Sequence, residues 1–334
     1  IRERFCHLMD ICREHSTAIR IGVNHGSLSP RMMEKYGDTP EGIVESCMEF
    51  LRIAVEYGFS DIVLSVKASN TRVMVDSVRM LVQQMDKEGM AFPLHLGVTE
   101  AGEGEDGRTK SAVGIGALLA DGIGDTIRVS LSEEPEAELP VARALRDYFA
   151  DPDSPRYHGN SARIEGKKLI YTGTETDPTL FALHAAAECG HLLWDNGLTD
   201  LEINAEGMER EALDKLAADI LQAARIRMYK TEFISCPGCG RTMFDLQQTV
   251  AEIKRNFSHL KGLKIGVMGC IVNGPGEMAD ADYGYVGAGR DRISLYKKTE
   301  CVRKNIPAAE AVKALIELIR ENGDWVEPSE PLAE

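Results

Sequence analysis

Residues 93–131 read PLHLGVTEAGEGEDGRTKSAVGIGALLADGIGDTIRVSL, and this stretch holds one complete unit of the predicted fold. A short apolar run at 93–98 is followed by a polar loop, a helical stretch at 109–121 and a second apolar run at 126–131. Strands that are almost continuously apolar and alternate with helices are typical of parallel sheets buried on both faces. The stretch therefore predicts two parallel strands joined by a helix.

The same unit recurs through the first 150 residues. Strands are predicted at 18–23 and 61–66 as well, and helices at 2–15, 40–57, 70–89 and 135–149. Four such units form either a small open sheet or half of an eight-stranded TIM-type barrel. A doubly wound sheet would also place its ligands at the carboxyl ends of its strands.

Polar side chains at these strand ends favour the barrel, because barrel enzymes place their chemistry there. They are Asn24, His25, Lys67, Ser69, Thr99, Glu100, Arg128 and Ser130. Arg20 and Arg128 lie inside apolar strands, where an unpaired cation is costly, so a bound anion is the favoured partner. Lys110 lies at the predicted start of a helix, where the helix dipole disfavours a cation unless a phosphate offsets it.

The composition narrows the class of protein. The chain has 334 residues, 43% of them hydrophobic and 27% charged, which is ordinary for a globular protein. A formal net charge of -15 argues against a nucleic-acid surface, and no apolar run is long enough to span a membrane. An anionic substrate must therefore be held by a few well-placed cations. The expected location is the cytoplasm, or a plastid in a plant. Because the chain opens with Ile inside a predicted helix, it is interpreted as a fragment.

The remainder of the chain divides into two parts. Residues 151–166 are rich in Pro, Asp, Ser and Gly and predict a linker, followed by strands at 168–172 and 200–205 and helices at 178–194 and 209–227. Beyond residue 229 the repeat gives way to a mixed pattern, which indicates a domain boundary. The predicted strands there are 230–235, 264–268, 283–286 and 292–296, with helices at 244–257 and 308–322. The predicted domains are 1–150, 151–228 and 229–334.

Three of the eight cysteines lie among glycine and proline. Cys236 and Cys239 belong to SCPGCGR at 235–241, and Cys270 belongs to GCIVNGPGE at 269–277. A Cys-x-x-Cys pair puts two thiolates on one turn, and the glycines let backbone N–H groups face the sulfurs, as iron–sulfur clusters require. The motif predicts a [4Fe–4S] cluster held by three thiolates, for which a non-cysteine fourth ligand would suit catalysis because one iron could then bind substrate. Composition leaves Glu277 and Cys301 open for that position.

Two plainer interpretations fit the cysteines less well. A structural zinc ribbon would normally show a second Cys-x-x-Cys, whereas Cys270 and Cys301 stand alone. A thioredoxin-like dithiol would leave the loop around Cys270 unexplained.

The residues resemble those of one family. SCPGCGRTMFDLQ and GCIVNGPGEMADADYGYVG resemble the cluster domain of the 4-hydroxy-3-methylbut-2-enyl diphosphate synthases. RIGVNHGSL, VLSVKASN, LHLGVTEAG and KSAVGIGALLADGIGDTIRVSL resemble the second half of that family's barrel. ALHAAAECGHLLWDNGLTDLEIN resembles the end of the extra domain of its long, three-domain form. The resemblance implies part of a (β/α)8 barrel, a remnant of the extra domain and a smaller sulfite-reductase-like iron–sulfur domain, with the first half of the barrel absent from this chain.

The resemblance also implies an activity. It is the reductive ring opening and dehydroxylation of 2-C-methyl-D-erythritol 2,4-cyclodiphosphate to 4-hydroxy-3-methylbut-2-enyl diphosphate in the non-mevalonate isoprenoid pathway. Two electrons would arrive through the [4Fe–4S] cluster from a ferredoxin or flavodoxin. The remnant of the extra domain points to a cluster domain that closes over the barrel of its own chain. The oligomeric state is left open, with a homodimer as one option.

Residue roles follow from the same resemblance. Cys236, Cys239 and Cys270 are implied to be cluster ligands, and Glu277 a displaceable fourth ligand. Glu100, in the TEAG motif, matches a carboxylate proposed to assist protonation. Positions that hold the diphosphate are matched by Arg20, Asn24, Lys110, Arg128 and Ser130, with Lys67 and His95 as weaker candidates.

Two rivals are retained. GCIVNGPGE followed by Gly284 and Gly287 is also similar to sulfite and nitrite reductases, but these would leave the barrel motifs unexplained. A zinc-stapled structural module is the non-enzymatic alternative, and a metal assay would separate it from both enzymes.

Overall fold

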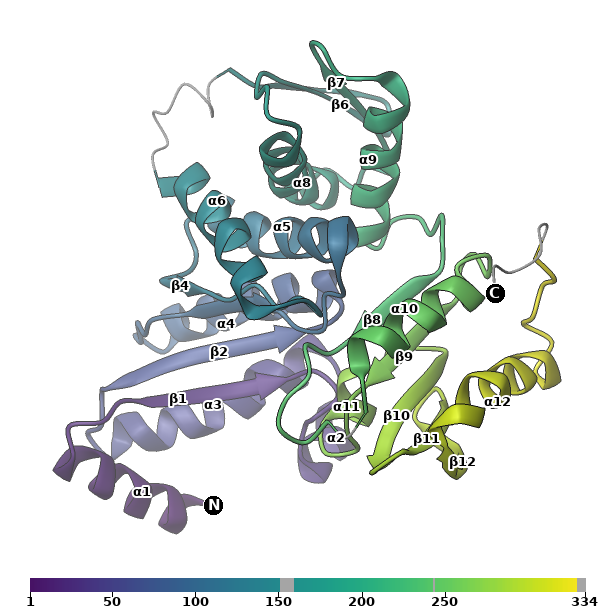
Figure 1. The fold of residues 1–334 in the computed structure, drawn as a ribbon. Helices are drawn as coiled ribbons and strands as arrows, with labels where there is room; N and C mark the ends of the chain where they lie inside the picture. The colour runs from purple at the N-terminus through teal and green to yellow at the C-terminus, as the bar shows by residue number, and fades with distance from the viewer. Residues whose placement is uncertain (151–158, 243, 329–334) are drawn as a thin grey trace.

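The computed structural model describes residues 1–150, 159–242 and 244–328. Across these residues the strands form a four-stranded, a three-stranded and a five-stranded sheet. Figure 1 shows the first sheet in purple and blue, the second in teal above it, and the third in green and yellow beside it. No helix among the described residues is long and apolar enough to cross a bilayer.

The first sheet is parallel, and its spatial order β1-β2-β3-β4 is the order of the chain. A doubly wound sheet reverses direction at its switch point, whereas consecutive strands of a barrel simply follow one another. The order therefore confirms the predicted barrel segment. The strands are β1 (Ile19–Asn24), β2 (Ile62–Ala68), β3 (His95–Val98) and β4 (Thr126–Ile127). The helices are α1 (Arg2–Glu14), α2 (Pro30–Tyr36), α3 (Pro40–Glu56), α4 (Thr71–Lys87), α5 (Gly104–Ala120), the 3-10 turn η1 (Pro135–Ala137) and α6 (Glu138–Ala150).

The two faces of this sheet differ. Ile21 and Val23 of β1 are buried in the core shared with α3 and α4, which cover one face. Because side chains alternate along a strand, Arg20 and Asn24 point to the other face. The register pairs Asn24 with Lys67, so both side chains belong to this second face. It is the face that a closed barrel would enclose.

Three element predictions in this part were wrong. Helix α5 begins at Gly104, five residues before the predicted start, with Glu105 and Asp106 in a first turn that the helix dipole favours. Strand β4 ends at Ile127 instead of 131. Helix α2 was not predicted, although Ser29 accepts a hydrogen bond from the Met32 N–H as its N-cap.

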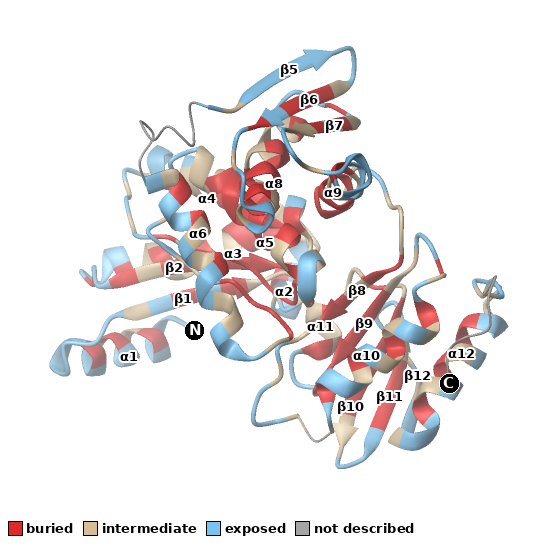
Figure 2. Ribbon diagram, turned by 45° about the horizontal axis from the view of Figure 1, so that its top comes forward, coloured by how far each residue is buried: buried red, intermediate tan, exposed pale blue. Residues whose placement is uncertain are grey.

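The second sheet has the order β5-β6-β7 and comprises β5 (Ser161–Glu165), β6 (Lys168–Gly173) and β7 (Asp200–Ala205). Its helices are α8 (Pro178–Asp195) and α9 (Arg210–Ala223). Strand β5 overturns part of the predicted linker at 151–166, since 161–165 pair antiparallel with β6; residues 151–158 lie outside the described residues. Figure 2 shows that β5 is exposed along its length. Its sequence therefore contains no apolar run that would predict a strand.

Helix α8 packs tightly against the barrel helix α5. A methyl group at Gly116 of α5 would lie 2.4 Å from the Ala187 side chain, and one at Gly190 of α8 would lie 3.0 Å from Val113. Small residues on both helices allow this approach. As a result α5 contributes Leu118 to the barrel core and Val113 to the core of the middle segment. Figure 2 shows α5 and α8 largely buried.

The third sheet has the order β12-β11-β10-β9-β8. Strands β8, β9 and β10 are parallel, while β11 and β12 continue antiparallel. The strands are β8 (Glu232–Ser235), β9 (Lys264–Met268), β10 (Tyr283–Gly289), β11 (Arg292–Lys297) and β12 (Glu300–Pro307), with helices α10 (Leu246–Phe257), α11 (Gly274–Glu277) and α12 (Ala308–Glu321). Strand β12 was not predicted, because its side chains are mostly exposed. The predicted domain limits at 150 and 228 stay a prediction.

Candidate functional site

The loops that follow β8 and β9 meet the carboxyl ends of the barrel strands. The Asn24 side chain, at the end of β1, donates to Glu277 Oε1 over 3.4 Å. Ser69, just after β2, donates to the Glu277 carbonyl over 3.2 Å. Ser132, beyond β4, contacts the Ser235 hydroxyl at 2.7 Å. The cysteine domain therefore sits over the barrel segment of its own chain.

Two glycines make the closest approach in this junction. A methyl group on Gly26 would lie 1.8 Å from the Gly276 carbonyl oxygen, and Gly26 has a φ of +79°. A methyl group on Gly276 would lie 2.4 Å from the Gly26 oxygen. Side chains are therefore excluded from both positions, which brings the NGPGE loop against the end of β1.

The three cysteines lie at the carboxyl ends of two neighbouring parallel strands. Cys236 directly follows β8, and Cys270 lies two residues beyond β9. The Gly269 N–H donates to Cys236 Sγ over 3.2 Å, and Arg241 Nε donates to Cys239 Sγ over 3.4 Å. Burial raises the pKa of Cys236, and the backbone N–H groups of Gly269 and Gly238 partly oppose this shift. The Arg241 hydrogen bond lowers the pKa of the exposed Cys239.

The donors around the thiols fit an iron–sulfur cluster. N–H groups aimed at cysteine sulfur are the contacts that stabilise and tune such clusters. Within the described ranges no three His, Cys, Asp or Glu side chains converge closely enough to hold one metal ion. Ligands of a [4Fe–4S] cluster bind different iron atoms, so they need not converge on a point.

Geometry separates the two candidates for a fourth ligand. Glu277 ends α11, in the same loop as Cys270, and is close enough to Arg241 and Cys236 to interact with both electrostatically. Cys301 lies on β12, three strands away from β9. Neighbouring strands are about 4.8 Å apart, so Cys301 lies well over 10 Å from the cysteine loops. Only Glu277 of the two lies beside the thiols.

Three cations gather on the uncovered face of the barrel sheet. Arg20, Lys67 and Arg128 line one cleft of about 590 Å³, and none of them forms an ion pair with any residue that the structure describes. The Lys67 ammonium is 6% exposed and donates to the Ser65 hydroxyl over 2.7 Å. Burial, then the charges of Arg128 and Arg20, lower its pKa to about 7. Such a group lacks an anionic partner.

Neutral side chains lie beside these cations. His95 Nδ1 lies 3.4 Å from the Arg20 guanidinium, and burial together with the nearby cations lowers the pKa of His95 to about 4. A neutral imidazole adds a hydrogen-bonding group and no charge. Asn24 and Asn273 also line the cleft. Asn273 was missed at the sequence level, although it lies in the quoted NGPGE motif.

Glu100 lies between the cations and the cysteines. It is 4% exposed and has a φ of +49°, and its carboxyl group lies close enough to that of Glu277 to interact with it electrostatically. Burial, followed by the charge of Glu277, raises its pKa to about 8. A protonated carboxyl group at neutral pH can donate a proton, as a general acid must.

Two of the residues predicted to bind the diphosphate, Lys110 and Ser130, do not line the cleft. Lys110 lies in the second turn of α5, not at its start, and its ammonium pairs with Glu232 Oε1 at 2.6 Å. The carboxylate that satisfies it comes from the cysteine domain, which the sequence could not reveal. Ser130 is buried two residues beyond Arg128 and does not line the cleft.

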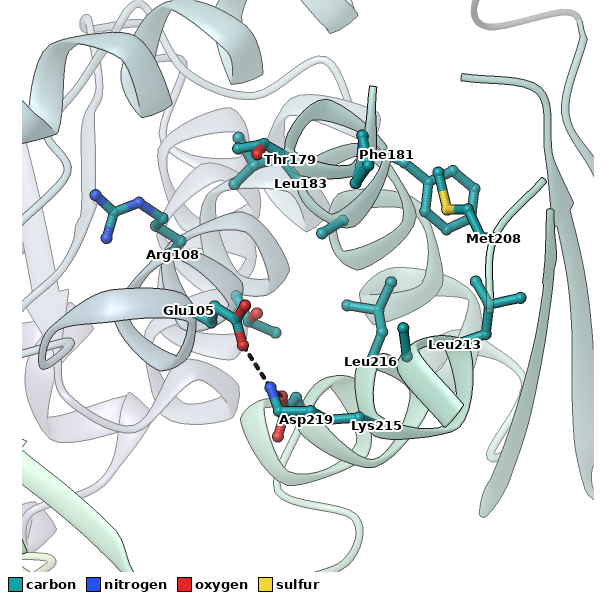
Figure 3. A pocket seen from close by; sticks show the side chains of 14 residues that line it. Glu105, Arg108, Thr179, Phe181, Leu183, Met208, Leu213, Lys215, Leu216 and Asp219 are labelled. Atoms are coloured by element: carbon teal, nitrogen blue, oxygen red, sulfur yellow. Dashed lines mark hydrogen bonds and ion pairs between the residues drawn. The ribbon is translucent and has the colours of Figure 1, made fainter. Parts of the chain in front are cut away.

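A second cavity, of about 290 Å³, lies between α5, α8 and α9 (Figure 3). Its walls are mainly apolar, with Phe181 and Leu216 among them. The charges at its rim neutralise one another, since Lys215 pairs with Glu105 and Asp219. It therefore offers no unpaired cation to an anionic ligand.

An enzyme that reduces a phosphorylated substrate needs cations for the phosphoryl groups beside a place for a redox group. This chain brings both together at the top of a parallel barrel segment. The fold and the site thus define a class, the barrel enzymes whose active end is covered by a cysteine-bearing domain.

Comparison with known proteins agrees with this class and identifies one family within it. Residues 1–143 match the family model described as the GcpE TIM-barrel domain, and 232–321 match the GcpE protein C-terminal domain. The chain belongs to the GcpE family. Neither rival interpretation accounts for both matches.

Three relatives illustrate the similarity, and each is named 4-hydroxy-3-methylbut-2-en-1-yl diphosphate synthase. The Parabacteroides distasonis protein, designated flavodoxin, is 45% identical over 98% of this chain and 77% of its own length. The Akkermansia muciniphila protein, also designated flavodoxin, is 38% identical over 98% of this chain and 75% of its own length. A Synechococcus protein, designated ferredoxin, is 44% identical over 98% of this chain and 64% of its own length.

Proposed function

We propose that this chain reduces 2-C-methyl-D-erythritol 2,4-cyclodiphosphate to 4-hydroxy-3-methylbut-2-enyl diphosphate in the non-mevalonate isoprenoid pathway. The dianionic cyclic substrate takes up two electrons and one proton and gives the trianionic linear diphosphate and one water. The ring C2–O bond breaks, the C3 hydroxyl group leaves as water, and a C2=C3 double bond forms. The observation that carries the proposal is the cleft with three unpaired cations beside the cysteine loops.

The cations of the barrel segment bind the diphosphate in this proposal. Arg20 and Arg128 supply planar guanidinium groups that bond phosphoryl oxygens in pairs, and Lys67 supplies a nearly buried point charge. Asn24 and Asn273 orient the hydroxyl-bearing part of the substrate from opposite sides of the junction. The anion in turn neutralises the charge that lowers the pKa of Lys67.

The cysteine loops hold the cofactor. We assign Cys236, Cys239 and Cys270 as ligands of a [4Fe–4S] cluster, with Glu277 at the fourth position, because the thiols and this carboxylate come from adjacent loops. When bound, such a cluster supplies single-electron transfer and a Lewis-acidic iron. The hydrogen bond from Asn24 holds the Glu277 carboxylate toward the barrel, where substrate binds.

Glu100 holds the proton that the reaction consumes. Its raised pKa keeps the carboxyl group protonated at neutral pH, and its position between Arg128 and Glu277 supports a role in giving that proton to the leaving hydroxyl group. Transfer of the proton to the hydroxyl oxygen lets it leave as water.

The electrons come from a small carrier protein. The names of the relatives include both flavodoxin and ferredoxin, and the exposed Cys239 beside Arg241 is the side of the site open to a partner. A cytoplasmic or plastid location and the oligomeric state stay predictions.

The experiment is iron, acid-labile sulfide and zinc analysis of anaerobically purified protein, followed by turnover with the cyclic diphosphate and dithionite-reduced carrier. About four iron and four sulfide per chain, an absorbance that bleaches with dithionite, and release of the linear diphosphate would support the proposal. One zinc without sulfide would overturn it. So would a loaded cluster with no turnover.

A further inference from the structure

Five charged side chains meet where the barrel segment, the middle segment and the cysteine domain join, and the proposed reaction does not use them. We call Lys110, Arg225, Glu232, Lys264 and Asp280 the anchor cluster. The side chains of Lys110, Arg225 and Glu232 are 7%, 12% and 8% exposed. Fully charged groups at such depth normally need a partner.

Arg225 is the centre of the anchor cluster. One guanidinium nitrogen pairs with Glu232, whose other oxygen pairs with Lys110 of α5 at 2.6 Å. The second guanidinium nitrogen lies 3.0 Å from Asp280, which also pairs with Lys264 of β9 at 2.9 Å. A single side chain from the middle segment therefore bridges two carboxylates of the cysteine domain.

Both carboxylates are connected to the proposed cluster ligands through short stretches of chain. Glu232 lies on β8, four residues before Cys236. Asp280 lies three residues after Glu277. Glu232 is the first residue of β8, and Asp280 pairs with Lys264, the first residue of β9. The bridge made by Arg225 therefore lies at the amino ends of the two strands whose carboxyl ends carry Cys236 and Cys270.

The backbone that carries Arg225 is itself fixed to the barrel segment. The Thr71 hydroxyl, at the start of α4, donates to the Ala223 carbonyl over 2.5 Å, and Trp194 Nε1 of α8 donates to the Ala224 carbonyl over 2.8 Å. Figure 1 shows the chain passing from α9 toward β8 at this point. The guanidinium therefore has a fixed position relative to the barrel.

Arg225 also occupies an unfavourable backbone conformation. Its φ is +59°, two residues beyond the end of α9 and directly after the C-cap Ala224, where glycine or asparagine is the usual residue. A left-handed conformation costs a larger residue about 1 kcal/mol or more. Glycine would adopt this backbone conformation at a lower free-energy cost. The arginine at this position is therefore explained by the ion pairs that its side chain makes with Glu232 and Asp280.

We propose that Arg225 is a positioning residue, which fixes the two cysteine loops relative to each other and to the barrel cations. The inference rests on the proposed function for its role in turnover. Buried ion pairs seldom stabilise a protein more than apolar side chains would, whereas they do define one geometry. Reacting groups must be held to within about 0.5 Å, so a small displacement of these loops would slow the reaction.

The test compares Arg225→Lys with Arg227→Lys in the full chain. A lysine ammonium cannot span Glu232 and Asp280 together, so the two loops lose their bridge while the net charge is unchanged. Arg227 lies two residues away, is exposed, and contacts Tyr229 and the Thr199 carbonyl instead. The measurements are iron content, kcat, KM for the cyclic diphosphate, and amide hydrogen exchange of 264–277 in the cluster-free protein.

The proposal expects Arg225→Lys to keep its iron and a KM within about twofold, because the cations lie on the barrel. Its kcat should fall tenfold or more, and exchange in 264–277 should rise, while Arg227→Lys behaves as the parent. Adding Asp280→Asn to Arg225→Lys should restore part of the protection, since it removes a carboxylate that has lost one of its two cationic partners and keeps only Lys264. If Arg225→Lys does not fold, Asp280→Asn alone tests the same bridge.

The outcomes separate this inference from the proposed function. Unchanged exchange and unchanged kcat in Arg225→Lys would overturn the positioning role, as would a loss of iron and thermal stability with no change in the ratio of kcat to iron. If the parent protein does not turn over the cyclic diphosphate, the proposed function fails, whereas the exchange measurement still decides whether Arg225 fixes the loops.

Discussion

Substrate binding should become weaker above neutral pH because of one side chain, Lys67. Burial and the charges of Arg128 and Arg20 lower its pKa to about 7, whereas an unfolded chain would hold it near 10.5. Both phosphoryl groups of a cyclic diphosphate are diesters and stay singly charged through this range. The neighbouring His95 is neutral throughout, because its pKa is lowered to about 4. Among the side chains that line the cleft, Lys67 is therefore the one that changes charge near pH 7. Glu100 lies next to the lining, and because its pKa is raised to about 8, its ionisation adds a smaller loss of affinity in the same direction.

The magnitude follows from proton linkage. If the bound diphosphate returns the pKa of Lys67 above about 9, the observed dissociation constant should rise roughly 25-fold between pH 6.5 and pH 8.5. Binding at about pH 8 should take up nearly one proton. The free energy of unfolding of the substrate-free protein should change with pH in the opposite direction to substrate affinity. Since the folded-state pKa is depressed, the charged ammonium disfavours folding below about pH 7, and stability should rise as the pH increases from there toward 10.5.

The assay is isothermal titration calorimetry with the cyclic diphosphate in buffers of different ionisation enthalpy. Lys67→Arg is the matched control, because a guanidinium remains charged and should leave only the smaller pH dependence that Glu100 contributes. A constant affinity in the parent protein between pH 6.5 and 8.5 would refute the reasoning. The same 25-fold slope in Lys67→Arg would show that another group titrates.

Three further predictions follow from the junction and the cores. Cys270→Ser should lose most bound iron and sulfide, whereas Cys301→Ser, three strands away, should retain both; equal loss in the two variants would contradict the assigned ligand set. Gly26→Ala should lower kcat/KM at least tenfold, because its methyl group would lie 1.8 Å from the Gly276 oxygen and force the loops apart, and wild-type kinetics would disprove the close contact. Gly116→Val should destabilise the fold by about 1–3 kcal/mol through overpacking of α5 against α8, measured by urea unfolding; an unchanged midpoint would mean that the helices can separate there.

The barrel segment was predictable because its signals are local. The pattern of apolar strands followed by amphipathic helices predicted the ends of β1, β2 and β3 to within two residues. Helices and strands without an apolar pattern were not predicted from the sequence. Strands β5 and β12 are largely exposed, and α2 is short and follows a loop, so only their tertiary contacts distinguish them from coil.

The site divides in the same way. Cys236 and Cys270 could be assigned to one site from the sequence alone. Glycine and proline around each thiol indicate a loop whose backbone N–H groups can face the sulfur. Lys110 could not be placed. Its position in a buried helix correctly suggests that it needs an anionic partner, but Glu232 lies more than a hundred residues away in sequence. A pattern within one segment cannot choose between a substrate phosphate and a distant carboxylate.

The double burial of α5 has a consequence for the order in which the chain matures on the ribosome. The helix ends at residue 120, yet the helix that covers its outer surface is complete only at residue 195. At about 5–20 residues per second of synthesis, Val113 and Ile115 face solvent for several seconds before α8 reaches them. During that interval the nascent barrel segment displays an apolar stripe to chaperones and to other nascent chains. A slower passage through residues 121–195 should lengthen this exposure and lower the yield of soluble protein, although the finished molecule would be unchanged.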